Sequence, residues 1–348
     1  MNKSFFFPIV CLIGGLLSAC SAATPPPVTR TPIPSATQPP PTATVTFTPS
    51  ITPTPVLPFD GKLVYSSDQD GDYEIFVMTA QSGVPVQLTH NETEDRYPAI
   101  SPGGSRIAYV SRVDGHFKLF IMDQDGTNTA LVYEHAELSI YDPKWSPGGE
   151  KIVTCIGDRD AETKTCDIFV IDLASGEATQ ITDLGYAICP EWSPDGEKLA
   201  FSSDFDGNPT IYITTSAGNE LFAPEPGDRW QLCPHWMPDG GKDLLALMGI
   251  AERVLVYTAY RAEVPSIMMA TDAGRREKIP THFSSLTEAT SWTLDGRGMI
   301  IERFDDSAHT STDIYIAQLH INLVLTEENL IHLTNSEGVD ETDSTWGP

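Results

Sequence analysis

The sequence predicts an all-β protein, a six-bladed β-propeller whose ring is closed by joining strands from the two ends of the chain. The first observation is a short repeat, which reads W-S-P-D-G at residues 192–196. The second is that the chain ends in W-G-P at 346–348, while D-G-K-L-V-Y follows a proline-rich stretch at 60–65. Laid end to end, the two termini complete one more copy of the repeat. A copy split in this way is what a circular array of blades requires.

Six copies of the repeat can be aligned. They lie at residues 100–104, 145–149, 192–196, 236–240 and 292–296, and at the split copy. Successive copies are 44 to 56 residues apart, and a four-stranded blade needs about 40–45 residues, so the last two units contain insertions. In the fifth unit the extra residues are 243–253. We expect this segment to lie outside the blade, either as an added hairpin strand or packed over the turn.

Each unit reads as four short strands. The first ends at the Trp, and Pro followed by Asp-Gly or Gly-Gly makes a tight turn in which Gly supplies a positive φ. A β-rich run such as 107–111 comes next, then a second turn that often contains Asp-Gly. The third strand is predicted at 74–78, 118–122 and 167–171, and the fourth ends in Leu-Thr or Ile-Thr at 88–89, 181–182 and 333–334. We interpret the repeated Trp as packing between neighbouring blades.

This pattern resembles the TolB-type propeller family, whose repeat reads W-S-P-D-G followed by I-A-F, I-Y-V-M-D and L-T. The resemblance covers residues 59–348 and rests on six matching copies. It implies a propeller that binds a partner. The protein after which the family is named carries a separate α/β domain before its propeller. We expect no such domain here, so contacts made through that domain are not carried over.

The N-terminal segment 1–19 is predicted to be a lipoprotein signal peptide. An apolar run from Phe5 to Leu17 follows Lys3, and it is short for a membrane span. It ends in L-S-A-C, which resembles the bacterial lipobox, and this implies that Cys20 becomes the lipidated N-terminus. The alternatives are an ordinary secretory peptide or an uncleaved anchor. Two or more acyl chains anchor a protein stably, so we expect a membrane-anchored protein facing outside the cytoplasm, in an inner or outer membrane.

Residues 20–58 are predicted to be a disordered tether between the lipid and the propeller. After Cys20 the segment is almost all Pro, Thr, Ser and Ala, which cannot bury a core. Such a segment favours extended polyproline II at about 3.1 Å per residue, giving a reach on the order of 100 Å. The predicted domains are therefore 1–19, 20–58 and 59–348.

The chain is strongly acidic, with a formal net charge of −27 from 48 acidic and 21 basic residues. This argues against nucleic acid as a partner, since such binding depends on Lys and Arg. It also argues against direct docking on anionic lipid. We expect a monomer that binds a protein or glycan of the cell envelope.

Four of the six cysteines remain once Cys11 and Cys20 are set aside. Cys155 and Cys166 flank one turn of the third unit. Cys189 and Cys233 occupy the same repeat position in neighbouring innermost strands. In an oxidising compartment this predicts the pairs 155–166 and 189–233, and four reduced buried thiols are the alternative.

Motifs for catalysis and metal binding are not found. There is no G-x-S-x-G nucleophile motif, and the eight histidines show no H-x-H or H-x-x-x-H spacing. The segment 68–74 (DQDGDYE) lacks the ligand order of an EF-hand, so we interpret it as an Asp-Gly hairpin turn. We expect no metal, no cofactor and no enzymatic activity.

The remaining candidate site is the mouth of the central channel, where the loops that lead into each innermost strand converge. The residues predicted there are Asp95, Arg96, Tyr97, Tyr141, Asp142, Tyr186, Arg229, Trp230, Glu288, Asp340 and Asp343. Aromatic side chains with Arg and acids suit recognition of a peptide or sugar, and ordinary loop polarity that caps the channel is the alternative. The sequence favours a non-catalytic binding module. The alternatives are a carbohydrate-active enzyme or sugar-binding module, and a structural stalk.

Overall fold

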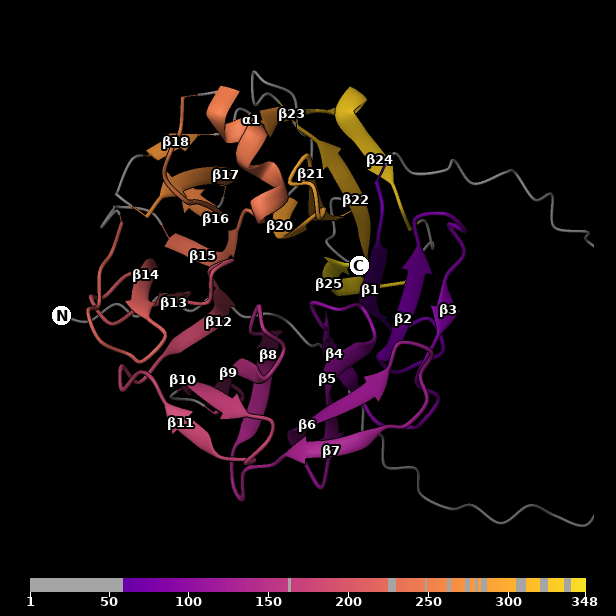
Figure 1. The fold of residues 1–348 in the computed structure, drawn as a ribbon. Coiled ribbons are helices and arrows are strands. Elements are labelled where there is room, and N and C mark those ends of the chain that lie inside the picture. The colour runs from indigo at the N-terminus through magenta and orange to yellow at the C-terminus, as the bar shows by residue number, and fades with distance from the viewer. Residues whose placement is uncertain are drawn as a thin grey trace, which may run out of the picture. The chain divides into compact units, whose positions relative to one another are not determined.

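The structure, a computed structural model, consists of small antiparallel sheets arranged around a central opening (Figure 1). It describes residues 59–161, 164–224, 230–247, 249–261, 264–272, 276–278, 281–282, 287–304, 311–319, 325–334 and 339–348. Six sheets form the blades, so the predicted six-bladed propeller is confirmed. The predicted signal peptide, Cys20 and the linker to residue 58 lie outside the described residues.

The first three blades are four-stranded. Blade 1 contains β1 (Lys62–Ser67), β2 (Glu74–Thr79), β3 (Val86–Gln87) and β25 (Glu341–Gly347). Blade 2 contains β4 (Asp95–Ile100), β5 (Arg106–Val113), β6 (His116–Asp123) and β7 (Ala130–Tyr133). Blade 3 contains β8 (Ser139–Trp145), β9 (Lys151–Asp158), β10 (Thr165–Asp172) and β11 (Ala178–Gln180).

The other three blades follow the same order. Blade 4 contains β12 (Ala187–Trp192), β13 (Lys198–Ser203) and β14 (Thr210–Thr215). Blade 5 contains β15 (Trp230–Trp236), β16 (Val254–Arg261), β17 (Val264–Thr271) and β18 (Arg276–Lys278). Blade 6 contains β20 (Thr287–Trp292), β21 (Gly298–Phe304), β22 (Thr312–Gln318) and β24 (Leu330–His332). A small parallel pair joins β19 (Thr281–His282) to β23 (Leu325–Thr326), and the short helix η2 (Glu327–Asn329) follows.

The ring closes through the two ends of the chain, as the split repeat predicts. β25 pairs antiparallel with β1, with Trp346 opposite Leu63. The Trp346 indole N–H donates to the carbonyl of Asp60 at 3.0 Å. Gly61 has a φ of +126°, and a side chain there would clash with the Trp346 ring. Glycine is therefore required where the N-terminal strand enters the closing blade.

The core lies between neighbouring blades. The second strand of each blade is covered on both faces, and in β13 the side chains of Leu199, Ala200 and Phe201 are fully buried. This explains why these strands read as continuous apolar runs rather than alternating ones. The repeated Trp packs at the same place, since the indole of Trp145 donates to Ala99 of the preceding blade at 2.9 Å. The predicted packing of the repeated Trp between neighbouring blades is thus confirmed for Trp145.

The Thr of the Leu-Thr ending accepts a hydrogen bond from the third strand of its own blade. The N–H groups of Ile75 and Ile168 donate to the hydroxyls of Thr89 and Thr182 at 2.8 and 2.9 Å. These N–H groups are buried, and an unpaired buried N–H is costly. The Thr therefore supplies the acceptor that the short fourth strand does not reach.

The insertion in blade 5 lies outside the sheet, as predicted, but it is helical. Residues 239–247 form η1 (Asp239–Gly241) and α1 (Lys242–Leu247) in place of a hairpin strand. The segment K-D-L-L-A-L is rich in helix formers, and Asp243 lies in the first turn, where a negative charge stabilises a helix. Leu245 is buried against the blade, while Leu247 is 71% exposed. Among the described helices, none has the length and apolar character needed to cross a membrane.

Candidate functional site

The innermost strands share a backbone distortion that sets the geometry of the channel. In each of them the pairing register shifts at one point. At this point Tyr97, Asp142, Cys189, Cys233 and Asp343 have φ between 47° and 55°. Such a left-handed conformation costs a non-glycine residue roughly 1–2 kcal/mol. Strain repeated at one position on five blades indicates that the packing around the channel holds these residues in place.

Two ion pairs lie at this level of the channel. The Arg96 guanidinium contacts the Asp343 carboxylate at 2.6 Å, which joins blade 2 to the closing strand. The Arg159 guanidinium contacts Asp142 at 2.9 Å within blade 3. All four side chains are between 12% and 23% exposed, so both pairs are shielded from water. We call Arg96, Tyr97, Asp142, Arg159 and Asp343 the mouth cluster.

Tyr97 lies between the two ion pairs. The charges of Asp343, Arg159 and Asp142 all act on its hydroxyl, and burial together with Asp343 raises the pKa of Tyr97 well above its usual value. Its ring makes an edge contact with Tyr141, with ring centres 6.3 Å apart. The phenol therefore stays protonated and can donate a hydrogen bond at any physiological pH.

Aromatic rings also hold the two arginines. The Arg96 guanidinium stacks on Tyr73 at 3.9 Å, and Arg159 lies over Tyr141 at 4.8 Å from the ring centre. The nearby Asp142 raises the pKa of Arg159 well above its ordinary value, although burial alone would lower it. A cation fixed between a carboxylate and a ring is oriented before any ligand arrives.

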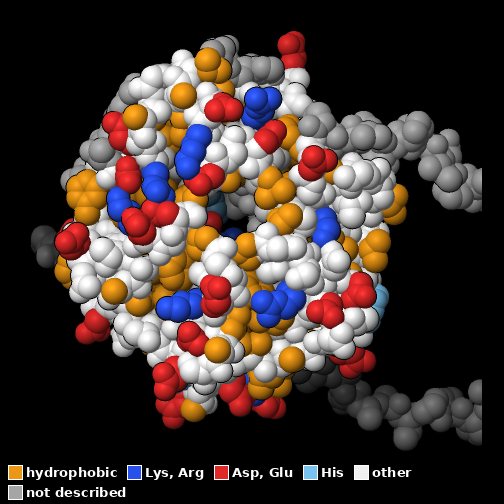
Figure 2. Space-filling view, in the orientation of Figure 1, with side chains coloured by type: hydrophobic (Ala, Val, Ile, Leu, Met, Phe, Trp, Pro, Cys, Tyr) orange, Lys and Arg blue, Asp and Glu red, His pale blue; other side chains and the backbone are white. Residues whose placement is uncertain are grey.

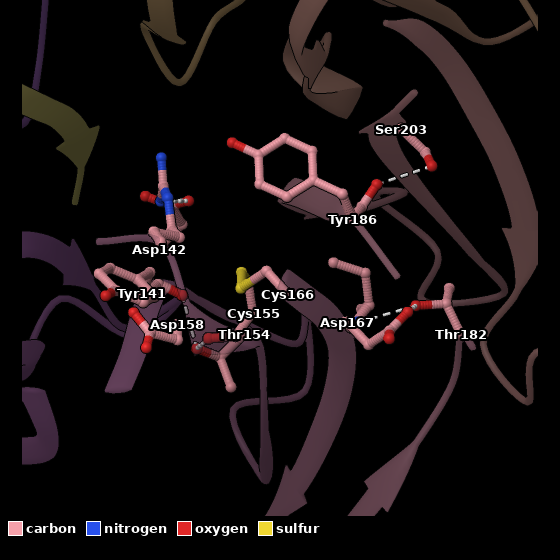
Figure 3. Close-up of a disulfide and its surroundings, with 12 residues drawn as sticks. Tyr141, Asp142, Thr154, Cys155, Asp158, Cys166, Asp167, Thr182, Tyr186 and Ser203 are labelled. Atoms are coloured by element: carbon pink, nitrogen blue, oxygen red, sulfur yellow. Dashed lines mark hydrogen bonds and ion pairs between the residues drawn. A yellow bond between two sulfur atoms is a disulfide. The ribbon is translucent and has the colours of Figure 1, made fainter. Parts of the chain in front are cut away.

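The disulfide Cys155–Cys166 fixes the hairpin that carries Arg159. It joins β9 to β10 with the two Cα atoms 5.8 Å apart, and the turn between these strands contains Arg159. Gly157 lies opposite Cys166, and a side chain there would clash with the backbone of Thr165 and Cys166. In Figure 3 the bridge lies between Asp142 on one side and Tyr186 on the other. The bridge thus supports one side of the mouth cluster.

The second disulfide, Cys189–Cys233, joins the innermost strands of blades 4 and 5, with Cα atoms 5.0 Å apart. Both cysteines occupy the distorted position of their strand. Both pairings predicted from the repeat are therefore confirmed. In blades 4 and 5 a disulfide engages the distorted position, whereas in blade 3 and in the closing strand of blade 1 the residues at this position, Asp142 and Asp343, form ion pairs.

The predicted mouth residues divide into buried, partly exposed and exposed side chains. Asp95 is fully buried and accepts a hydrogen bond from Asn91 at 2.8 Å, so it is not presented to a ligand. Tyr141 is also buried. Tyr186 and Asp340 are partly exposed, and Asp340 accepts from the Tyr73 hydroxyl at 2.5 Å.

Trp230 and Glu288 are the exposed members of the predicted set. Trp230 is 42% exposed, and Glu288 accepts a hydrogen bond from Tyr260. Arg229 lies outside the described residues. The sequence prediction missed Arg159 because it considered only the loops that lead into innermost strands, whereas Arg159 follows the second strand of its blade. An arginine between two aspartates, in a turn flanked by two cysteines, was the available signal.

Glu302, on β21 of blade 6, is an acid outside the predicted set that bonds to the closing strand β25. It accepts hydrogen bonds from the Ser344 backbone at 2.8 Å and from the Thr342 hydroxyl at 3.0 Å. Burial, and then the charge of Asp343, raises the pKa of Glu302 to about 8. It is therefore largely protonated at neutral pH. Among the described residues, no group of three or more His, Cys, Asp or Glu side chains is arranged to hold a metal ion.

Comparison with known proteins supports the repeat assignment. Residues 135–249 match the family described as "PD40: TolB beta propeller domain". The "Protein TolB homolog" of Chlorobium luteolum is 31% identical over 156 residues, which are 44% of this chain and 34% of that protein. The chain thus contains a TolB-like β-propeller domain and spans about a third of the length of this relative.

Solved structures show the same fold. TolB from Acinetobacter baumannii superposes with a TM-score of 0.64 at 15% identity, covering 83% of this chain and 67% of that one. An oligogalacturonate lyase in complex with manganese superposes with a TM-score of 0.53 at 18% identity, covering 74% of this chain and 71% of the lyase. At these identities the similarity extends to the fold alone.

Proposed function

We propose that this protein is a lipid-anchored binding module of the cell envelope, which recognises a partner at its channel mouth without chemical conversion. The TolB-like propeller supports a protein-binding role. The feature on which the proposal depends is the mouth cluster, where two arginines are held in fixed orientation around Tyr97. Strained backbone, oriented cations and a permanently protonated phenol together favour recognition.

A matched pair of arginine variants tests this role. Arg159→Leu removes a mouth cation, whereas Arg106→Leu removes a cation that stacks on Trp145 at 4.8 Å, near the turn at residues 101–104. The full chain, immobilised in detergent, is expected to retain a partner from an envelope extract. Arg159→Leu is expected to weaken that retention at least tenfold, and Arg106→Leu to leave it unchanged. Equal retention by both variants would move the binding site away from the mouth.

A carbohydrate-active enzyme is the second candidate, and Glu302 favours it. A carboxyl group held protonated near neutral pH is able to act as a general acid, and a lyase shares the fold. Incubating the full chain with oligogalacturonate and other acidic oligosaccharides, followed by product analysis, separates the two candidates. Intact oligosaccharide is expected. Cleavage that disappears in Glu302→Gln would establish the enzyme instead.

Anchoring through Cys20 has its own test. In cells fed an alkyne-labelled fatty acid, the wild-type chain is expected to take up label and to sediment with membranes. Cys20→Ala is expected to lose the label, and Cys11→Ala to keep it. Label that persists in Cys20→Ala would show that the lipobox interpretation is wrong.

A further inference from the structure

At one end of the second strands a basic residue recurs at the same repeat position, and at the other end aspartates recur in the turns. Near the start of the second strand each blade has one basic residue: Lys62, Arg106, Lys151, Lys198, Arg253 and Arg297. Figure 2 views the face that carries α1 and shows Lys and Arg side chains around the central opening, with Asp and Glu side chains among them. At the other end of the second strand, four described turns carry aspartates: Asp68, Asp70 and Asp72, Asp114, Asp158 and Asp160, Asp204 and Asp206.

Four of the cations on this second face, which holds the mouth cluster, are paired with carboxylates. Besides Arg96 and Arg159, Arg112 contacts Glu94 at 3.0 Å and Lys118 contacts Glu134 at 2.7 Å. Each of these four cations is already engaged with a carboxylate. The turn between β13 and β14, residues 204–209, carries Asp204 and Asp206 and no basic residue, so a molecule that approaches this turn meets negative charge.

Two large aromatic side chains are exposed on this acidic face. Phe205 is 56% exposed and Trp230 is 42% exposed. The segments that carry them are joined, because the N–H of Gln231 at the start of β15 donates to the carbonyl of Pro209, in the turn before β14, at 2.8 Å. Asp204 and Asp206 flank Phe205 in that turn. We call Phe205, Trp230, Asp204 and Asp206 the blade-4 rim.

The exposure of Trp230 is exceptional in this protein. The other five tryptophans, Trp145, Trp192, Trp236, Trp292 and Trp346, are 5–7% exposed. When a partner covers an exposed Trp and an exposed Phe, apolar surface is removed from water, and this lowers the free energy of the complex. Aromatic faces flanked by carboxylates also attract Arg and Lys through cation–π and ionic contacts.

We propose that the blade-4 rim is a docking surface for a basic segment of a protein partner, one that presents Arg or Lys next to an apolar side chain. Phe205 and Trp230 contact the apolar side chain and the stems of the cations, while Asp204 and Asp206 pair with the charged groups. The sign of the surrounding field selects a cationic segment over an acidic one. The proposal rests on the binding function proposed above and names the class of partner.

The charge around Trp230 can be measured without any partner. Because the other tryptophans are buried, quenchers in solution reach Trp230 selectively. Each quenching constant is divided by that of the same ion for free N-acetyltryptophanamide, and on this scale caesium is expected to quench the exposed fluorescence of the full chain at least twofold more efficiently than iodide at equal ionic strength. Trp230→Phe is expected to remove the quenchable fraction of the fluorescence. The double variant Asp204→Asn/Asp206→Asn is expected to reduce the difference between the quenching efficiencies of caesium and iodide. Relative quenching by iodide that equals or exceeds that of caesium would overturn the assignment of a cationic partner.

Binding is tested with defined peptides. An octapeptide of alternating Arg and Leu is expected to shift Trp230 emission and bind the full chain, while its Glu-Leu counterpart and a neutral hexasaccharide are expected not to bind. Phe205→Ser and Trp230→Ser are each expected to weaken Arg-Leu binding at least tenfold, with tryptophan-independent calorimetry as the readout. Val86→Ser is the matched control, because Val86 is 55% exposed on β3 of blade 1.

The outcomes separate this proposal from the function of the mouth. If both rim variants bind the peptide like the wild type, the rim proposal is wrong. If Phe205→Ser and Trp230→Ser also retain the envelope partner that Arg159→Leu loses, the mouth cluster remains the binding site for that partner. Equal loss in Val86→Ser would reveal non-specific attraction to an acidic protein. Binding of the hexasaccharide that Trp230→Ser abolishes would replace the basic peptide by a glycan.

Discussion

Trp346→Ala is expected to destabilise the propeller by about 3–5 kcal/mol, the usual loss for a buried Trp. The indole is 6% exposed, packs in the core of the closing blade and donates to the Asp60 carbonyl. Alanine leaves a cavity and an unpaired carbonyl at the one place where the ring is not continuous in sequence. Chemical denaturation of the full chain, followed by circular dichroism, gives the free energy of unfolding.

Trp230→Ala is the matched control, because it removes the same side chain from an exposed position and is expected to cost about 0.5 kcal/mol or less. Truncation after Thr342 tests the closure itself. It removes most of β25 and leaves backbone groups of β1 unpaired, so the loss is expected to exceed that of Trp346→Ala. A truncated chain that melts within a degree or two of the full chain would contradict closure through the two ends.

Stability is expected to fall as the pH rises from about 5 to 8, in contrast to the usual acid denaturation. Burial raises the pKa of Glu74 from its ordinary value to about 7, and that of Glu302 to about 8. A raised pKa means that the folded protein binds the proton more tightly than the unfolded chain. The stabilisation is therefore present below about pH 4.5 and is lost as the pH passes 7 and then 8. For the fully buried Glu74 the loss is on the order of 3 kcal/mol.

Glu74→Gln isolates this effect. The amide resembles the protonated carboxyl, and its oxygen still accepts the hydrogen bond that the Asn91 backbone donates at 2.7 Å. The variant is expected to melt like the wild type at pH 5 and at a higher temperature at pH 8. The exposed Asp183→Asn is expected to leave the pH profile unchanged. A wild-type melting temperature that rises steadily from pH 5 to pH 8 would show that the burial of Glu74 does not govern stability.

The repeat in the sequence determined the number of blades, the closure through 60–65 and 346–348, and both cysteine pairings. These features depend on which strand a residue belongs to and on its position in that strand. A periodic sequence records both directly, because every copy reports the same local geometry. The apolar run at 244–248 was ambiguous for the opposite reason, since a short apolar segment fits a strand or a helix equally well, and tertiary packing of Leu245 decided for α1.

Only the tertiary structure decided which charged groups meet in the channel. Arg96 pairs with Asp343, 247 residues away, and Arg159 with Asp142 across two strands of blade 3. Asp95, adjacent to Arg96 in sequence, is instead buried with Asn91. These outcomes depend on sheet twist and on the left-handed residue in each innermost strand, which rotate neighbouring side chains in different directions. The sequence contains no local signal for that rotation, because its cause is the packing of one blade against the next.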